Sequence, residues 1–316
     1  MNNQKNTKIA LGTWSWGVGN IGGDQVFGNH LGEKELRPVF EAAMNAGLNL
    51  WDTAVVYGIE ASENVLSAFT KQYPREDIVI STKFTPQIAS NSVNPVEEML
   101  NGSLARFDTD YIDMYWIHNP ADVEKWTPFL SSLVKSGKVK KVGVSNHNLN
   151  QIKRVEEILS QEDVHISAIQ NHYSLLYRSS EDGGILDYCK EKGIEFWAYM
   201  VLEQGALSGK YNTQNPLPEG SQRSATYNPM LPQIEKLTDV MCAVGKKYQA
   251  STAQVAIAWA IAKGTIPLIG VTKVEQVQDA AKAAQIELSD EDMAQIETVA
   301  ARIGVDTKGS WENPMV

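Results

Sequence analysis

The chain has 316 residues, of which 43% are hydrophobic and 21% are charged, as in an ordinary globular protein large enough for one α/β barrel or two average domains. Its 28 basic and 38 acidic residues give a net charge of −10, which offers no electrostatic attraction to nucleic acid or to an anionic membrane. With only two cysteines, a disulfide framework is not expected. Neither a signal peptide nor a long apolar run occurs, so we expect a cytoplasmic protein with no membrane partner. From the net charge we also expect no nucleic-acid partner.

Short apolar runs alternate with amphipathic segments along nearly the whole chain. The runs predict eight strands at Lys8–Trp14, Leu48–Thr53, Asp77–Phe84, Tyr111–Ile117, Val139–Ser145, Ile166–Asn171, Glu195–Met200 and Thr265–Gly270. Strands that alternate with helices are typical of parallel β/α repetition. We therefore predict an α/β fold, a (β/α)₈ TIM barrel that makes residues 1–316 a single domain.

Helical periodicity predicts helices at Glu33–Asn45, Pro95–Phe107, Trp126–Ser136, Asn150–Ser160, Gly184–Lys192 and Thr252–Lys263. Asn94 precedes the second of these as an N-cap with Pro95 in the first turn, and Gly137 follows the third as a C′ residue. The connection after the seventh strand is unusually long and contains the Pro- and Gly-rich stretch 215–220. A loop of that length predicts a lid or a binding segment.

The segment Gly17–Gly22 matches the G-x-G-x-x-G pattern of dinucleotide-binding Rossmann folds. In that fold the motif turns directly from a strand into a helix, whereas residues 23–30 show no helical period and the next helical pattern begins near Glu33. We interpret the segment as a flexible glycine-rich loop at the barrel mouth, flanked by Trp14 and Trp16.

Four polar residues, Asp52, Tyr57, Lys83 and His118, close or immediately follow three predicted strands. The carboxyl ends of barrel strands meet at one mouth, so we expect these side chains to converge there. A tyrosine beside an ammonium, a carboxylate and an imidazole can donate a proton to a carbonyl oxygen, and we expect Lys83 to lower the pKa of Tyr57. The alternatives are a surface tyrosine beside an unrelated Asp–Lys pair, and a structural histidine.

Several motifs then occur in one order: Leu11-Gly12-Thr13, Asn49–Gly58 with Ser62-Glu63-Asn64, Gly143–Asn146, and Gly205–Tyr211. Together they make the chain resemble the aldo-keto reductase family, in the branch that includes bacterial oxidoreductases and potassium-channel β subunits. The resemblance implies Tyr57, Lys83, Asp52 and His118 as catalytic residues. It also implies NADPH, with NADH less favoured, lying across the barrel mouth without a Rossmann fold.

The resemblance assigns cofactor contacts by position. It places Gly12, Thr13, Trp14 and Asp52 at the nicotinamide end, Ser145, Asn146 and Gln170 on its carboxamide, Tyr199 on its ring, Met200, Val201, Leu202, Gln204 and Gly205 along the pyrophosphate, Lys210 and Arg223 on phosphate, and Gly270, Thr272, Lys273, Gln276 and Asp279 at the adenosine end. The chain departs from the family pattern at Met200, where a serine is usual, and at Asp279 and Ala280, where glutamate and asparagine are usual.

The implied reaction is the reversible reduction of an aldehyde or ketone, with Trp14, Tyr57, Trp116 and His118 next to the substrate. Trp16 and Trp311 could add to an aromatic pocket, and the tail Lys308–Pro314 could either fold over the barrel mouth or pack simply as a chain terminus. The alternative is a nicotinamide-binding regulatory or sensor subunit with little turnover. A metal-dependent barrel hydrolase is disfavoured because the five histidines contain neither His-x-His nor His-Glu-x-x-His. Substrate identity and oligomeric state stay open.

Overall fold

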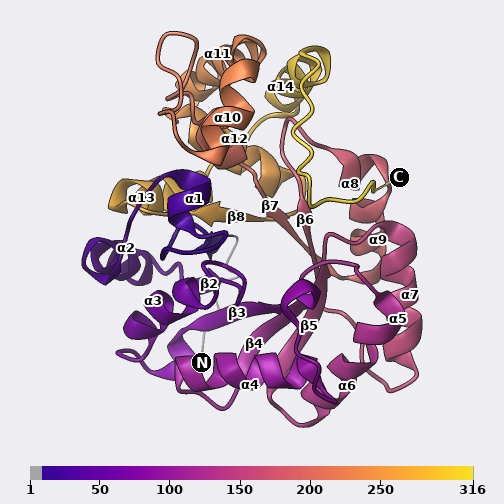
Figure 1. Ribbon diagram of the computed structural model, residues 1–316. Helices are drawn as coiled ribbons and strands as arrows, with labels where there is room; N and C mark the ends of the chain where they lie inside the picture. The colour runs from indigo at the N-terminus through magenta and orange to yellow at the C-terminus, as the bar shows by residue number, and fades with distance from the viewer. Residues whose placement is uncertain (1–8, 316) are drawn as a thin grey trace.

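A closed barrel of eight parallel strands forms the centre of the protein, as the computed structural model of residues 9–315 shows (Figure 1). The strands are β1 (Ala10–Gly12), β2 (Leu50–Asp52), β3 (Val79–Phe84), β4 (Ile112–Ile117), β5 (Val139–Ser145), β6 (Ala168–His172), β7 (Glu195–Tyr199) and β8 (Ile266–Gly270). Each strand pairs with the next in the chain, and β8 pairs with β1. The prediction of a (β/α)₈ barrel is confirmed.

Helices surround the barrel (Figure 1). They are α1 (Gly23–Phe27), α2 (Glu33–Asn45), α3 (Ala61–Thr70), α4 (Pro95–Phe107), α5 (Val123–Trp126), α6 (Pro128–Lys135), α7 (Leu149–Ser160), α8 (Ser179–Asp182), α9 (Ile185–Lys192), α10 (Gln222–Tyr227), α11 (Leu231–Lys247), α12 (Thr252–Ala262), α13 (Val274–Ala283) and α14 (Asp290–Arg302), with 3₁₀ turns at Arg75–Asp77, Pro86–Ile88, Glu203–Ser208 and Asn228–Met230. The long connection after β7 carries α10, α11 and α12, and in the view of Figure 1 α10 and α11 lie with α14 at the top, to one side of the barrel.

Two expected helices have the predicted bounds, namely α2 and α4. The side chain of Asn94 caps α4 by accepting a hydrogen bond from the Glu97 N–H at 3.1 Å, as predicted. The helix expected over 126–136 is present as α6, but it begins at Pro128 rather than at Trp126, which ends the short helix α5. Proline has no N–H and can start a helix but not continue one, so it divides the segment.

The glycine-rich loop also differs from expectation, since the short helix α1 begins directly after Gly22. A five-residue helix is too short to show a hydrophobic period in the sequence. The Rossmann interpretation is still excluded, because β1 belongs to the closed barrel.

The first two strands are shorter than predicted, at three residues each. Lys8, the expected start of β1, lies outside the described residues. A tight turn follows each of these two strands. After β1 the Thr13 carbonyl accepts a hydrogen bond from the Trp16 N–H at 2.9 Å, and after β2 the Ala54 carbonyl accepts one from the Tyr57 N–H at 3.1 Å. These turns bring residues 13–14 and Tyr57 to the barrel mouth.

The barrel interior is filled in layers. The apolar layer contains Ala10, Leu50, Met114, Trp116, Ala168 and Trp197. Polar residues of β2, β3 and β6, namely Asp52, Ser81, Lys83 and Gln170, are 2% exposed or less. A second, larger core packs the outer faces of the strands against the helices. No helix within residues 9–315 is long and apolar enough to cross a membrane.

Candidate active site

One cavity of about 1270 Å³ opens at the carboxyl ends of the strands and is lined from nearly every mouth loop. Every residue that the resemblance places against the cofactor lines it: Gly12, Thr13, Trp14, Asp52, Ser145, Asn146, Gln170, Tyr199, Met200, Val201, Leu202, Gln204, Gly205, Lys210, Arg223, Gly270, Thr272, Lys273, Gln276 and Asp279. Tyr57 and His118 line it as well. The fold therefore brings the predicted residues into one continuous space.

Lys83 lies under the cavity floor and does not line it. Its ammonium donates to Asp52 Oδ2 at 2.5 Å and to the Thr53 carbonyl at 2.8 Å, and it lies 5.3 Å from the centre of the Tyr57 ring. The Ser81 hydroxyl and the Gln170 amide donate to Asp52 Oδ1 at 2.6 and 3.1 Å. The buried Asp52 carboxylate thus accepts three hydrogen bonds, and the Lys83 ammonium donates two.

The pKa of Tyr57 is raised well above its usual value of 10.0, first by burial and then by the charge of Asp52. This contradicts the expectation that Lys83 lowers it. The physical reason is first that burial removes the phenol from water, which disfavours the phenolate, and second that the negative charge of Asp52 acts in the same direction. The pKa of Lys83 is itself lowered, chiefly by its burial. The site consequently holds Tyr57 as a protonated phenol at neutral pH.

The imidazole of His118 faces the phenol, with ring centroids 5.8 Å apart. Burial, and secondly the charge of Lys83, lower the pKa of His118 well below 6.5, so the ring is neutral near pH 7. Its Nδ1 lies 3.0 Å from the Thr85 hydroxyl. When Thr85 donates to Nδ1, the ring proton is on Nε2, where it can be donated to a ligand oxygen.

Two of the predicted tryptophans do not face the cavity. Trp116 is fully buried in the barrel interior, where its Nε1 donates to the Ser81 hydroxyl at 2.7 Å, so its expected contact with substrate is wrong. Trp16 is buried against Trp51. Trp14 does line the cavity, stacked on Tyr57 with ring centroids 5.7 Å apart. The direction of Trp116 follows from side-chain alternation along β4, whereas Trp14 and Trp16 lie in the turn beyond β1, where no such alternation applies.

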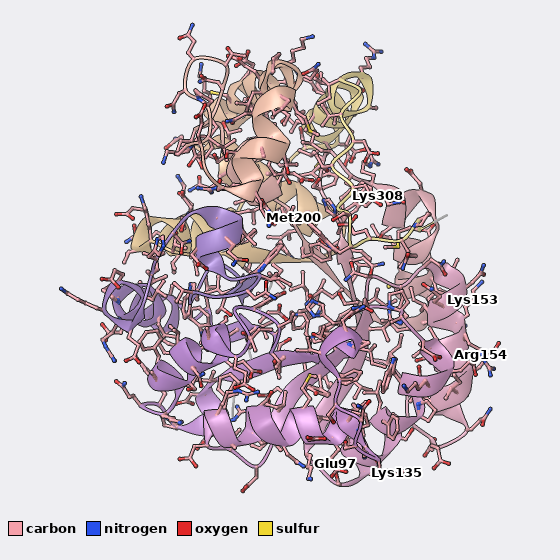
Figure 2. The ribbon with its side chains drawn as sticks, viewed as in Figure 1. Glu97, Lys135, Lys153, Arg154, Met200 and Lys308 are labelled. Atoms are coloured by element: carbon pink, nitrogen blue, oxygen red, sulfur yellow. The ribbon has the colours of Figure 1, made fainter. Side chains whose placement is uncertain are left out.

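At the far side of the mouth, the Asn146 amide donates to the His118 carbonyl at 2.9 Å, and the Tyr199 hydroxyl lies 2.6 Å from Asn146 Oδ1. Met200, labelled in Figure 2, lies where the barrel meets the segment that carries α10 and α11. Its φ of 61° and that of Gln204, 51°, fold the chain back so that the backbone itself borders the cavity.

Arg223 of α10 reaches back over this turn and donates to the Gln204 carbonyl at 3.2 Å. Its Nε is buried and has no hydrogen-bond partner among residues 9–315. An unsatisfied guanidinium N–H at a cavity wall is a donor available to an anion. Lys210 also lines this end.

The adenosine end expected from the resemblance lies at the start of α13. Gln276 Oε1 accepts from the Thr272 N–H at 2.6 Å, the Thr272 hydroxyl at 3.2 Å and the Lys273 N–H at 3.0 Å. Three donors therefore converge on one oxygen at a helix N-terminus, the arrangement that also suits a phosphate oxygen. Asp279 is held by the Gln254 amide at 2.6 Å.

Sequence reasoning missed Thr85, Phe27 and the residues that hold the C-terminal segment, His172 and Glu312. Thr85 had a signal, since it lies two residues after Lys83. Phe27 and Glu312 had none, because a five-residue helix and a chain end carry no periodicity. Within the described part of the chain, no group of three or more His, Cys, Asp or Glu side chains could hold a metal ion.

The model of the aldo/keto reductase family matches residues 8–301. The chloroplastic pyridoxal reductase of Arabidopsis thaliana is 30% identical, covering 92% of this chain and 82% of that one. The NADH-specific methylglyoxal reductase of Escherichia coli is also 30% identical, covering 90% and 92%. The solved structure of a glycerol dehydrogenase from Gluconobacter oxydans superposes with a TM-score of 0.79 at 24% identity, covering 96% and 94%. The chain therefore belongs to the aldo/keto reductase family and is an NAD(P)H-dependent oxidoreductase that interconverts carbonyl groups and alcohols.

Proposed function

We propose that this protein reversibly reduces an aldehyde or ketone to the alcohol, with NADPH as the preferred nucleotide and Tyr57 as the proton donor. The observation that carries the proposal is the protonated Tyr57 phenol in the cavity wall, beside the neutral His118 ring and above the buried Lys83–Asp52 pair. An acid, a neutral hydrogen-bond donor and a fixed ion pair are the groups that carbonyl reduction requires.

The cavity fits a dinucleotide with a substrate beside it. Its volume exceeds the roughly 300–1000 Å³ of a pocket for one small molecule. Basic side chains at Lys210, Arg223 and Lys273 border the end away from Tyr57, against the net charge of −10. The unpartnered Nε of Arg223 and the donors gathered around Gln276 Oε1 suit phosphate groups. These residues would hold the nucleotide.

When bound, the nicotinamide supplies a hydride to the carbonyl carbon. Tyr57 transfers its proton to the carbonyl oxygen, so that hydride and proton together convert C=O into CH–OH and leave a phenolate. Lys83 lies 5.3 Å from the phenol ring and stabilises that phenolate, while Asp52 keeps the ammonium in place. His118 donates to the carbonyl oxygen from Nε2, which orients and polarises it.

The preference for NADPH rests on the N-terminus of α13 and on Lys273, where a 2′-phosphate would replace Gln276 Oε1 as acceptor. The Escherichia coli relative is named as NADH-specific, so nucleotide choice varies among relatives. The test is a titration of both nucleotides by quenching of tryptophan fluorescence. Tighter binding of NADH would contradict the preference, and no binding of either would overturn the proposal.

Turnover is then tested by following NADPH oxidation with a panel of aldehydes and ketones. Oxidation that depends on Tyr57 supports the reductase. Nucleotide binding without turnover of any carbonyl would favour the regulatory alternative. We also propose a cytoplasmic location, in keeping with the acidic, cysteine-poor composition, and cell fractionation would test it.

A further inference from the structure

The C-terminal tail, residues 303–315, crosses back from α14 to the barrel. It descends toward α8 in yellow in Figure 1, and Lys308 marks it in Figure 2. The tail is docked at its far end, where Met315 is 2% exposed and its sulfur accepts from the Asn171 amide at 3.6 Å. Between these points Ser310, Trp311 and Asn313 line the active-site cavity. The tail is thus part of the cavity wall.

A buried triad of charged side chains fastens the tail. His172 at the end of β6 has Nδ1 2.8 Å from Glu312 Oε1 and Nε2 2.9 Å from Glu203 Oε1. The exposed fractions of His172, Glu203 and Glu312 are 0%, 0% and 6%. A neutral imidazole has one N–H, so only the charged ring donates to both carboxylates. The pKa of His172 is accordingly raised to about 9, with its burial opposed by the charges of Glu203 and Glu312.

The two carboxylates are held differently. Glu203 also accepts hydrogen bonds from the hydroxyls of Tyr227, Ser174 and Thr307, so its place is fixed from four directions. Glu312 is held through Oε1, and its Oε2 is buried without a partner among the described residues. The hydrogen bonds to the Glu312 carboxylate therefore come from His172 and from one further side chain.

That further contact is the Tyr199 hydroxyl, which lies 3.0 Å from Glu312 Oε1 and 2.6 Å from Asn146 Oδ1. A phenol has a single proton, so it serves one of these oxygens at a time. The preceding residue, Trp311, donates from Nε1 to the same hydroxyl at 3.4 Å and packs edge-on against Trp14 with ring centroids 6.0 Å apart. The Glu312 carboxylate thus contacts both Tyr199, which lines the cavity, and His172, which holds the tail.

We propose that Glu312 is a positioning residue for carbonyl reduction: it holds Trp311 as a specificity-determining wall of the substrate pocket, and His172 and Glu203 hold Glu312 in turn. This inference rests on the proposed function. Trp311 is 47% exposed beside Trp14 and Tyr57, so it offers apolar area to a substrate with an aromatic or other large apolar group. A small carbonyl compound would gain little from it.

The test compares KM for an aromatic aldehyde and for a two- or three-carbon aldehyde. Trp311→Ala should raise KM for the aromatic aldehyde about tenfold, the equivalent of losing one aromatic contact, and should change KM for the small aldehyde less than about twofold. Glu312→Ala should change the two KM values in the same way. Glu312→Gln keeps an acceptor oxygen, so it should raise KM for the aromatic aldehyde only about threefold. Asp306→Asn is the matched control, since it removes one exposed carboxylate from the same tail, and both KM values should stay unchanged.

The double variant separates positioning from general damage. If Glu312 acts through Trp311, adding Glu312→Ala to Trp311→Ala should change the ratio of KM for the aromatic aldehyde to KM for the small aldehyde less than about twofold. A change of about tenfold in that ratio in the double variant relative to Trp311→Ala would overturn the proposal, as would an unchanged ratio in Trp311→Ala alone. Far-ultraviolet circular dichroism and the nucleotide titration of each variant would show that it is folded.

A second readout needs no activity. Trypsin cleavage after Lys308 requires local opening of the tail, so in nucleotide-free protein it should proceed about tenfold faster in Glu312→Ala than in wild type or Asp306→Asn. Equal rates would mean that Glu312 does not hold the tail. If wild type oxidised no NADPH with any carbonyl, the proposed function would fail, and the cleavage rates would still decide whether Glu312 fastens the tail.

Discussion

Replacing His172 with glutamine tests how much of the folding free energy depends on one buried charge. The pKa of His172 is raised from 6.5 to about 9 in the folded protein. Because the folded state binds the proton more tightly, this stabilisation is fully present below pH 6.5 and is lost as the pH rises through 9. A shift of that size corresponds to about 3 kcal/mol, an order-of-magnitude value for a fully buried group. Glutamine cannot carry the charge, so the variant lacks this contribution at every pH.

The assay is urea unfolding of wild type and His172→Gln at pH 7 and at pH 9.5. The stability difference between them should shrink by about 2 to 3 kcal/mol over that range. His118 and His147 do not interfere, because burial lowers the pKa of both, that of His147 to about 4, and they stay neutral throughout. A stability difference that is the same at both pH values would refute the argument that His172 is charged between Glu203 and Glu312.

Three further predictions concern the reaction. Tyr57→Phe should lower kcat by about 100-fold or more while the Kd for NADPH changes less than about threefold, and near-normal turnover would disprove the role of the phenol. Lys83→Met should lower the free energy of unfolding, measured in urea, by about 3 to 5 kcal/mol because it leaves Asp52 buried without its cation. Adding Asp52→Asn to that variant should restore most of the stability but not the activity. Gln276→Arg should raise the ratio of NADPH to NADH affinity about tenfold by adding a guanidinium where Thr272 and Lys273 present their N–H groups; an unchanged ratio in fluorescence titrations would place the 2′-phosphate elsewhere.

The barrel and the convergence of Asp52, Tyr57 and His118 could be predicted because strand ends in a parallel barrel share one mouth. The N-cap at Asn94 could be predicted because capping is local chemistry. The direction of the Tyr57 pKa could not be predicted, since it depends first on how deeply the phenol is buried and then on its distance from Asp52. A sequence shows which charges exist and leaves their distances open.

The sequence by itself determined the fold class, the family resemblance and the residue types available for the chemistry, because periodicity, turn signals and motifs are local in the chain. Only the tertiary structure decided that Trp116 fills the barrel interior while Trp311 reaches the cavity, and that His172, Glu203 and Glu312 meet. These contacts join residues up to 140 positions apart. They follow from register, burial and the path of the tail, which depend on the packing of the whole chain.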